Sequence, residues 1–258
     1  MKLGIIGLGN MGSAIIKGGI ANGYLKAEEI YAYDLDESKM DAIKGIHKTN
    51  SEKELVESID LLLVAIKPYH VEGFVERNKE ALANKGIISI ALGWNFVKYN
   101  DILLPSTRHQ YIMPNTPCLV GEGMAIIEAD GTLYQEEYDF AKGLFDSLGT
   151  AVVLPAHLIG VAGTVSGCGP AFMFVILEAL GDAGVKYGVP RNQAYQIAAQ
   201  MMLGSAKLML ETAQHPGVLK DQVCSPAGST IRGVSSMEDD GVRAAMIHAV
   251  EKAFKMED

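Results

Sequence analysis

Short apolar runs and helical patterns alternate through the first 158 residues of the chain. The apolar runs are short and bounded by polar or glycine residues, which is typical of strands, and they lie at residues 2–6, 29–33, 60–66, 86–91, 108–112, 124–128 and 151–154. Helical spacing of apolar residues separates several of them, at about residues 12–22, 51–58 and 133–148. Strands that alternate with helices predict a doubly wound, mainly parallel sheet with helices on both faces.

The pattern changes after about residue 158, where the strand signals stop. An apolar helix is expected from about 171 to 184, after Ser-Gly-Cys-Gly-Pro at 166–170, and it is apolar on almost every side. Helical spacing then continues over about 194–209 and 242–254. We therefore predict two domains, an α/β domain over residues 1–158 and an all-helical domain over 159–258. The apolar helix should be buried, and an interface between subunits is one place for it.

A glycine-rich turn joins the first strand to the first helix, and it consists of Gly7, Leu8, Gly9, Asn10, Met11 and Gly12. Gly7 suits a tight turn, Gly9 lets the backbone approach a pyrophosphate, and Gly12 lets the helix lie close to the strand. Asp34 follows the second strand, where a dinucleotide site has the acid that binds the adenosine ribose. These features predict a Rossmann-type cofactor site. The alternatives are an ordinary glycine-rich turn and an Asp34 that caps the next helix.

The charge of Asp34 bears on which dinucleotide binds. A carboxylate accepts hydrogen bonds from ribose hydroxyls and repels a 2′-phosphate, and no arginine lies nearby in the sequence to reverse that preference. We expect NADH or NADPH as the cofactor, with a lean towards NADH. Lys39 is the residue that could instead reach a phosphate.

Further unusual loops each follow a predicted strand: Lys67-Pro68, Gly93 and Met113-Pro114-Asn115-Thr116-Pro117. Ligands of open α/β sheets bind beyond the carboxyl ends of the strands, so we expect one edge of the sheet to collect these loops. The alternatives are that Lys67 is a solvated charge at a strand end and that Asn115 only forms a turn.

A second anion site is predicted by Ser-Pro-Ala-Gly-Ser-Thr at 225–230. Pro226 fixes one φ angle, Gly228 admits unusual backbone angles, and the amides of Gly228, Ser229 and Thr230 should be free where the next helix begins. Free amides at a helix start bind anions. The alternative is that Ser229 and Thr230 are helix caps, since both residue types are favoured there.

Composition and net charge limit the classes of partner that the protein can bind. The chain has 258 residues, of which 48% are hydrophobic, and a net charge of −9, which argues against binding nucleic acid or an anionic membrane surface through a basic patch. No apolar run looks long enough to span a bilayer, and the start of the chain does not resemble a signal peptide. We expect a cytoplasmic protein whose partners are a small molecule and further copies of itself.

Cysteines and histidines offer little other chemistry. The three cysteines, Cys118, Cys168 and Cys224, are an odd number at unpatterned spacings, which fits reduced thiols in a cytoplasm. All three lie in motif loops, so we expect them to face one cleft. No metal-ligand spacing occurs, and no metal is predicted. The six histidines are scattered, and each is expected at the surface or at a helix cap.

Several motifs in this order resemble the pyrroline-5-carboxylate reductases, and the resemblance covers nearly the whole chain. It rests on the glycine turn, Ala65-Ile66-Lys67-Pro68, and residues 113–117, 166–172 and 215–239. The resemblance implies hydride transfer from NAD(P)H to the C=N bond of Δ1-pyrroline-5-carboxylate, which gives L-proline as the last step of proline biosynthesis. It also implies a homodimer or a ring of dimers. Rival functions are a reductase of another imine or keto acid, and a dinucleotide sensor without catalysis.

The resemblance also implies roles for individual residues. Ala65, Lys67, Pro68, Asn115 and Thr116 would line the cofactor on the nicotinamide side. The substrate would meet Gly167 and Cys168 together with the loop residues Ser225, Ala227, Gly228, Ser229 and Thr230, which hold its carboxylate. Thr230 resembles the hydroxyl beside the imine nitrogen and is the candidate catalytic residue.

Two positions depart from the usual pattern of this family. Cys168 stands where a small serine is frequent, and Ala227 stands where glycine is frequent. Alanine at a positive φ would cost about 1 kcal/mol. Either the φ angle of Ala227 is negative here, or the loop is slightly altered.

Overall fold

The computed structural model describes residues 1–254 of the chain. The chain forms two compact units, Met1–Gly167 and Cys168–Asp258. The contacts thus divide the chain later than residue 158, where the strand pattern in the sequence stops.

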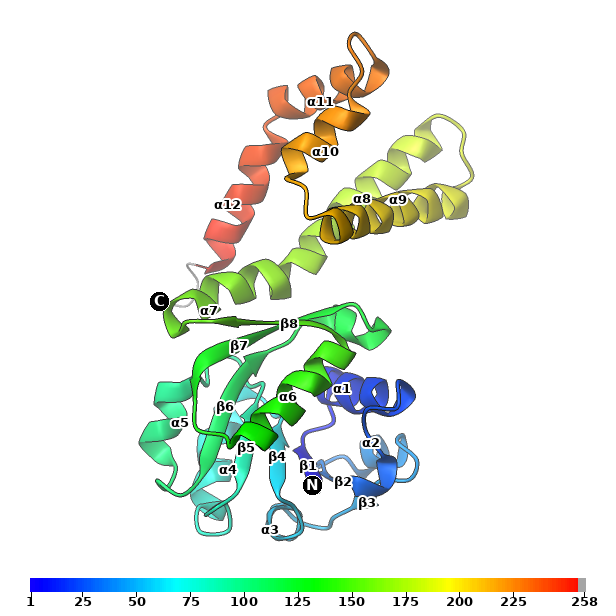
Figure 1. Cartoon of the computed structure of the whole chain (residues 1–258). Helices are drawn as coiled ribbons and strands as arrows, with labels where there is room; N and C mark the ends of the chain where they lie inside the picture. Colours follow the sequence, from blue (N-terminus) through cyan, green and yellow to red (C-terminus); the bar gives the residue numbers. More distant parts are fainter. Residues whose placement is uncertain (255–258) are drawn as a thin grey trace. The chain divides into compact units, whose positions relative to one another are not determined.

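An eight-stranded sheet forms the centre of the first unit, with strand order β3-β2-β1-β4-β5-β6-β7-β8 (Figure 1). Its strands are β1 (Leu3–Ile6), β2 (Ile30–Tyr33), β3 (His47–Lys48), β4 (Leu61–Val64), β5 (Gly86–Ser89), β6 (Arg108–Met113), β7 (Gly123–Gly131) and β8 (Gly149–Leu154). All neighbouring pairs are parallel except β6 and β7. The prediction of a mainly parallel, doubly wound sheet is confirmed, although the two-residue strand β3 was not predicted.

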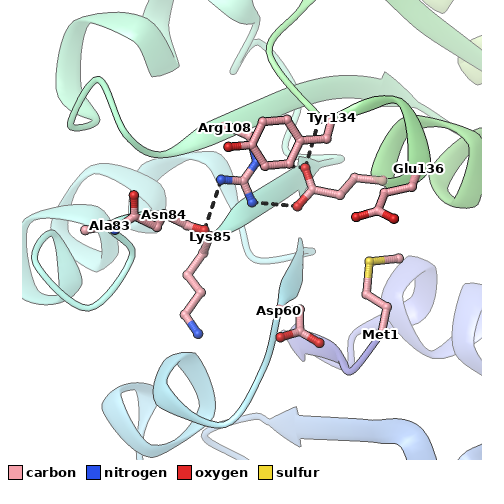
Figure 2. Close-up of a pocket in the computed structure, with 9 residues that line it drawn as sticks. Met1, Asp60, Ala83, Asn84, Lys85, Arg108, Tyr134 and Glu136 are labelled. Carbon is pink, nitrogen blue, oxygen red and sulfur yellow. Dashed lines mark hydrogen bonds and ion pairs between the residues drawn. The ribbon is translucent and has the colours of Figure 1, made fainter.

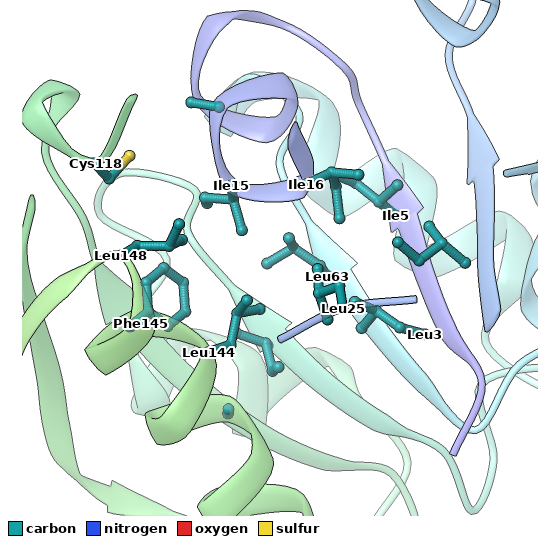
Figure 3. Packing of buried hydrophobic residues seen from close by; sticks show 14 of the residues in the cluster. Leu3, Ile5, Ile15, Ile16, Leu25, Leu63, Cys118, Leu144, Phe145 and Leu148 are labelled. Atoms are coloured by element: carbon teal, nitrogen blue, oxygen red, sulfur yellow. The ribbon is translucent and has the colours of Figure 1, made fainter. Parts of the chain in front are cut away.

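Helices cover both faces of this sheet. They are α1 (Asn10–Ala21), α2 (Glu37–Asp41), α3 (Glu52–Glu57), α4 (Pro68–Asn78), α5 (Phe96–Ile102), α6 (Gln135–Ser147) and α7 (Ala156–Gly163), with 3₁₀ turns at Ala27–Glu29 and Thr116–Val120. The buried residues of β4 alternate between the two faces: Leu61 and Leu63 pack with α1 and α6, and Leu62 and Val64 pack with α3, α4 and α5. Figure 3 shows Ile15 and Ile16 of α1 pointing towards Leu63. This period of two is the expected signature of a strand covered on both faces.

His109 of β6 contradicts the expectation that every histidine lies at the surface or at a cap. Its side chain is buried, its ring stacks on Phe96 at 4.9 Å, and its Nε2 lies 3.2 Å from the carbonyl oxygen of Phe96. Because that carbonyl can only accept, Nε2 carries the hydrogen. Burial lowers the pKa of His109. The imidazole is therefore a neutral core residue that fixes α5 to the sheet.

The second unit consists of α8 (Gly169–Lys186), α9 (Arg191–Thr212), α10 (Pro216–Val223), α11 (Ser229–Asp239) and α12 (Val242–Phe254). Helices α8 and α9 pack closely, since a Cβ atom added to Gly181 would lie 2.1 Å from the ring of Tyr195. Yet within residues 168–254 only Gly181, Ala194 and Ala198 are buried. Phe174 of α8 is 67% exposed. Within the second unit of a single copy the apolar helix is therefore mostly exposed. Its expected burial at an interface between subunits stays a prediction.

Helices α7 and α8 are joined by a π-helical turn, Thr164–Cys168, so that Ala156–Lys186 runs as one helix of 31 residues. This helix is long enough and apolar enough to cross a membrane by length and composition, since an 18-residue stretch within it has a mean hydropathy of 1.7. The expectation that no apolar run has that length is therefore wrong. The sequence suggested a break at Ser-Gly-Cys-Gly-Pro, where the helix instead widens and continues.

Candidate active site

The carboxyl ends of β1, β2, β4, β5 and β6 share one edge of the sheet because these strands are mutually parallel (Figure 1). The glycine turn, Asp34, residues 65–68, Gly93 and residues 113–117 each follow one of these strands. The structure thus brings the predicted cofactor residues of the first unit to the same edge, as the sequence predicted.

Gly7 and Gly12 are required by the packing of the turn itself. Gly7 has a φ angle of +93°, and a Cβ atom on it would lie 2.7 Å from the carbonyl oxygen of Ala65. A Cβ atom on Gly12 would lie 2.2 Å from the carbonyl oxygen of Gly7. At Gly9 an added Cβ would meet no atom within 4 Å. Gly9 therefore leaves open space at the start of α1, which fits a dinucleotide pyrophosphate that approaches the backbone there.

Asp34 closes the glycine turn through its side chain. One carboxylate oxygen accepts the N–H of Leu8 at 2.6 Å, and the other accepts the N–H of Asp36 at 2.9 Å and lies 3.2 Å from Nζ of Lys39. The alternative that Asp34 caps the next helix is wrong, because Asp36 is the N-cap of α2 and accepts the N–H of Ser38. The carboxylate at the end of β2 is thus fixed, and one lysine partly balances its charge.

Lys67 and Pro68 follow β4 and begin α4, with Lys67 at the N-cap and Pro68 in the first turn. Lys67 is exposed, and within residues 1–254 its ammonium group has no hydrogen bond or ion pair. The Pro68 carbonyl accepts the indole N–H of Trp94 at 2.8 Å, which ties this turn to the loop after β5. The turn is therefore fixed in place, and its lysine carries an unpaired positive charge.

Asn115 is more than a turn former. Its side chain is buried, its Nδ2 donates to the carbonyl oxygen of Ser166 at 2.9 Å, and its Oδ1 accepts the N–H of Met124 at 2.8 Å. Thr116 begins the 3₁₀ turn that follows. Nearby, Met113 lies against Gly163, where an added Cβ would be 2.1 Å from the sulfur. No local pattern indicates that Asn115 meets Ser166 or that Met113 meets Gly163, because these partners lie about 50 residues apart along the chain.

Cys118 does not face a cleft with the other two cysteines. It is buried in the core beside α1, its thiol lies 3.6 Å from the sulfur of Met11, and burial raises its pKa. Cys168 is exposed and Cys224 is half-buried. The expectation that all three share one cleft is therefore wrong for Cys118. Residues 1–254 contain no group of three or more histidine, cysteine or acidic side chains placed to hold a metal.

The loop at 225–228 is a tight turn, and its backbone shows whether the φ angle of Ala227 is negative or positive. The Gly228 amide donates to the Ser225 carbonyl oxygen at 3.0 Å, Pro226 occupies the second position, and Ala227 has a φ angle of +57°. This is the pattern of a type II turn, which favours glycine at the third position. Ala227 therefore adopts the left-handed conformation, although this conformation is less favourable for alanine than for glycine. Gly228 is required for another reason: a Cβ on it would lie 2.3 Å from the Ser225 hydroxyl.

Ser229 and Thr230 are the first two residues of α11, and Gly228 is its N-cap, without any side-chain cap. The alternative that these two hydroxyl groups are caps is therefore wrong. Within residues 1–254 neither hydroxyl has a hydrogen-bond partner. The Gly228 amide is occupied by the turn, contrary to expectation, whereas the Ser229 and Thr230 amides belong to the first helical turn, where N–H groups lack intrahelical partners. Two backbone donors and two hydroxyls remain available for an anion.

A pocket of about 610 Å³ lies elsewhere in the first unit. Its lining includes Asp60, Lys85, Arg108 and Tyr134, which precede or open β4, β5, β6 and α6, so it lies at the amino-terminal edge of the sheet (Figure 2). Arg108 binds both carboxylate oxygens of Glu137, at 2.6 Å and 2.8 Å, and its guanidinium lies 4.0 Å from the centre of the Tyr134 ring. None of the predicted site residues lines this pocket. Lys85 donates to the carbonyl oxygen of Ile59, and Asp60 accepts the N–H of Lys2, so these two charges are also engaged by the fold.

Comparison with known proteins adds independent evidence. Residues 156–258 match a family model described as pyrroline-5-carboxylate reductase dimerisation, and residues 2–93 match one described as NADP oxidoreductase coenzyme F420-dependent. The chain is 38% identical to the pyrroline-5-carboxylate reductase of Treponema pallidum, covering 98% of this chain and 99% of that protein. It is 37% identical to that of Escherichia coli K12, covering 98% and 96%.

Solved structures agree with these matches. The pyrroline carboxylate reductase of Plasmodium falciparum, crystallised with NADP bound, has a TM-score of 0.90 at 31% identity, covering 99% of this chain and 96% of that one. The pyrroline-5-carboxylate reductase of Coxiella burnetii has a TM-score of 0.91 at 29% identity, covering 99% and 96%.

Proposed function

The chain belongs to the pyrroline-5-carboxylate reductase family, and from that premise we propose that its two anion sites serve one reaction, the reduction of Δ1-pyrroline-5-carboxylate to L-proline. A bound nicotinamide cofactor supplies a hydride to C5 of the substrate. The π electrons of the C=N bond move to nitrogen, which also carries or gains one proton. The protein must therefore hold a small ring by its carboxylate and favour positive charge on nitrogen.

The residues at the carboxyl edge of the sheet fit the phosphate and ribose parts of a dinucleotide. Gly9 leaves open space at the start of α1, and Asp34 presents a fixed carboxylate at the end of β2. Ala65, Lys67, Pro68, Asn115 and Thr116 would border the nicotinamide half. The exposed Lys67 is suited to balance phosphate charge, while the Asn115 side chain is already engaged and would act by holding its loop.

The choice between the two cofactors follows from Asp34. The ammonium group of Lys39 lies 3.2 Å from this carboxylate and balances part of its charge. Because Lys39 is already paired with Asp34, it is not free to bind a phosphate. A 2′-phosphate would have to break that pair or lie beside the carboxylate. We therefore infer a preference for NADH, although the Plasmodium relative was crystallised with NADP.

The substrate carboxylate is assigned to the turn at 225–230 together with Gly167 and Cys168. The observation that carries this assignment is the left-handed φ of Ala227, +57°. The chain keeps a strained turn at a residue poorly suited to it, and strain of this kind persists where function needs the geometry. The amides and hydroxyls of Ser229 and Thr230 would then bind the carboxylate, and the Thr230 hydroxyl would lie beside the imine nitrogen.

The assembly follows from the same evidence. Within residues 168–254 one copy buries no large apolar side chain, and the second unit matches the family's dimerisation region. The apolar helix that could cross a membrane by composition lies within this region, so a second copy accounts for its exposed face. We propose a homodimer, extended to a ring of dimers, that acts in the cytoplasm on a small molecule and binds neither nucleic acid nor membrane.

Substrate range tests the function directly. Purified protein should oxidise NADH with pyrroline-5-carboxylate, and it should do so with a much higher kcat/KM than with the six-membered cyclic imine acid or with 2-keto acids. Oxidation with a keto acid but not with either imine would refute the assignment. Comparing kcat/KM for NADH and NADPH in the same assay tests the cofactor preference separately.

A further inference from the structure

Asn115 joins three segments that lie apart in sequence. It is 7% exposed, it precedes the 3₁₀ turn Thr116–Val120, its Oδ1 accepts the Met124 amide at the start of β7, and its Nδ2 donates to the carbonyl of Ser166. Ser166 lies in the π-helical turn Thr164–Cys168. The side chain thus uses an acceptor and a donor at once, and both partners are backbone groups.

The Ser166 carbonyl needs this donor because of the residue four positions later. In an α-helix the carbonyl of residue 166 would accept the N–H of residue 170. Residue 170 is proline, in the first turn of α8, and proline has no N–H. Isolated π turns inside α-helices are rare, and those that occur often lie at functional sites. The Asn115 amide therefore replaces a helical hydrogen bond that Pro170 removes.

A second contact holds the same turn. Met113 lies directly against Gly163, at a position where any side chain on residue 163 would overlap its sulfur. Packing alone limits the distance between the loop after β6 and the helix, but it does not fix the rotation of the turn about the helix axis. The directed hydrogen bond to the Ser166 carbonyl does fix that rotation.

We propose that Asn115 is a positioning residue for the substrate. It orients the π-helical turn that carries Gly167 and Cys168, by supplying the hydrogen bond that Pro170 denies to Ser166. This inference rests on the proposed function, because only that function assigns Gly167 and Cys168 to the substrate. The glycine turn is held separately by Asp34. Loss of the Asn115 contact should therefore lower kcat/KM for the imine acid, while the glycine turn keeps its own support.

The sharpest variant is N115D, whose new carboxyl group has the shape of the amide. When protonated, this group can accept the Met124 N–H and donate its O–H to the Ser166 carbonyl; when ionised, it has no donor and repels that carbonyl. At pH 8 kcat/KM for the imine acid should be about 10-fold or more below that of the unaltered protein. The ratio of the two proteins should rise towards one as the pH falls. Kinetics at saturating cofactor separate this loss from any change in cofactor binding, since Asn115 also holds a loop assigned to the nicotinamide half.

A matched control is N78D. Asn78 is also buried and donates from Nδ2 to two acceptors, the Phe74 carbonyl and Glu52, but it lies in α4 away from the proposed substrate residues. Its replacement should lower the unfolding temperature without a pH-dependent recovery of kcat/KM. Hydrogen exchange of a peptide spanning 163–168 gives a readout that needs no activity: N115D should accelerate it at pH 8, and N78D should not.

If N115D does not fold, a double-mutant cycle replaces it. P170A restores an N–H at residue 170, so N115A should lower kcat/KM much less in the P170A background than in the unaltered chain. A pH-independent N115D ratio, or equal effects of N115A in both backgrounds, would overturn the proposal. An unaltered protein that fails to turn over the imine acid would instead refute the proposed function, and the exchange measurement would still test the contact.

Discussion

Replacing Ala227 by glycine should stabilise the protein slightly and leave the substrate turn intact. Ala227 has a φ angle of +57°, and its exposed methyl group packs against no core. The left-handed conformation costs alanine about 1 kcal/mol relative to glycine. Glycine in turn makes the unfolded chain more flexible, which costs about 0.5 kcal/mol. The net expectation is a gain of about 0.5 kcal/mol, or roughly 1–2 °C in Tm.

Ala213 provides a matched control for that substitution. It is also exposed, has a φ angle of +52°, and ends α9 instead of forming the predicted substrate turn. A213G should therefore give a similar small gain in Tm. Valine tests the converse, because a β-branched side chain is poorly tolerated at positive φ. A227V should raise KM for the imine acid, whereas A213V should lower Tm without changing KM.

The assay combines thermal unfolding with steady-state kinetics on the same samples. The protein concentration is kept fixed, since the proposed assembly would make Tm depend on it. Two results would refute the reasoning. A227G could lower Tm by more than about 1 °C, which would mean that the left-handed angle is not strained. Alternatively, A227V could leave KM unchanged, which would remove this turn from the substrate site.

Three further predictions follow from named contacts. D34N should shift the ratio of kcat/KM for NADPH over NADH upwards by about 10-fold, because it removes the charge that repels a 2′-phosphate; an unchanged ratio would contradict the role given to Asp34. T230V should lower kcat/KM for the imine acid by roughly 100-fold with Tm nearly unchanged, since the half-buried hydroxyl has no partner within residues 1–254, and full activity would exclude it from the mechanism. Burial lowers the pKa of His109, so its contribution to stability is present above the unfolded value of about 6.5 and is lost as the pH falls through the lower folded value. H109Q should therefore make the free energy of unfolding less dependent on pH between about 7 and 5, and equal pH slopes in urea unfolding would refute this.

The first unit could be predicted closely from the sequence because local patterns determine it. Gly7, Gly12 and Asp34 follow strands whose parallel pairing sends their carboxyl ends to one edge, so motif order alone placed them together. His109 could not be predicted, because a single polar residue in a strand does not reveal a stacking partner on a helix packed over it.

The second unit and the long-range contacts were harder to predict, for physical reasons. The apolar character of α8 indicated burial, but composition does not say whether the same chain or another copy provides the cover. The sign of the φ angle of Ala227 could not be predicted, because a positive φ costs alanine only about 1 kcal/mol, which a folded protein tolerates. The partner of Asn115 is a backbone carbonyl 51 residues away, and every residue has such a carbonyl, so the residue type does not identify the partner. Pro170 indicates only that the carbonyl four residues before it lacks a helical N–H donor.

Isotope transfer tests the central claim most directly. NADH deuterated at the transferable position of C4 is incubated with the protein and pyrroline-5-carboxylate, and the amino acid product is analysed by mass spectrometry and chiral separation. L-proline with one deuterium at C5 is the expected product. Unlabelled proline, deuterium at another carbon, or no proline at all would contradict the reaction assigned to this chain.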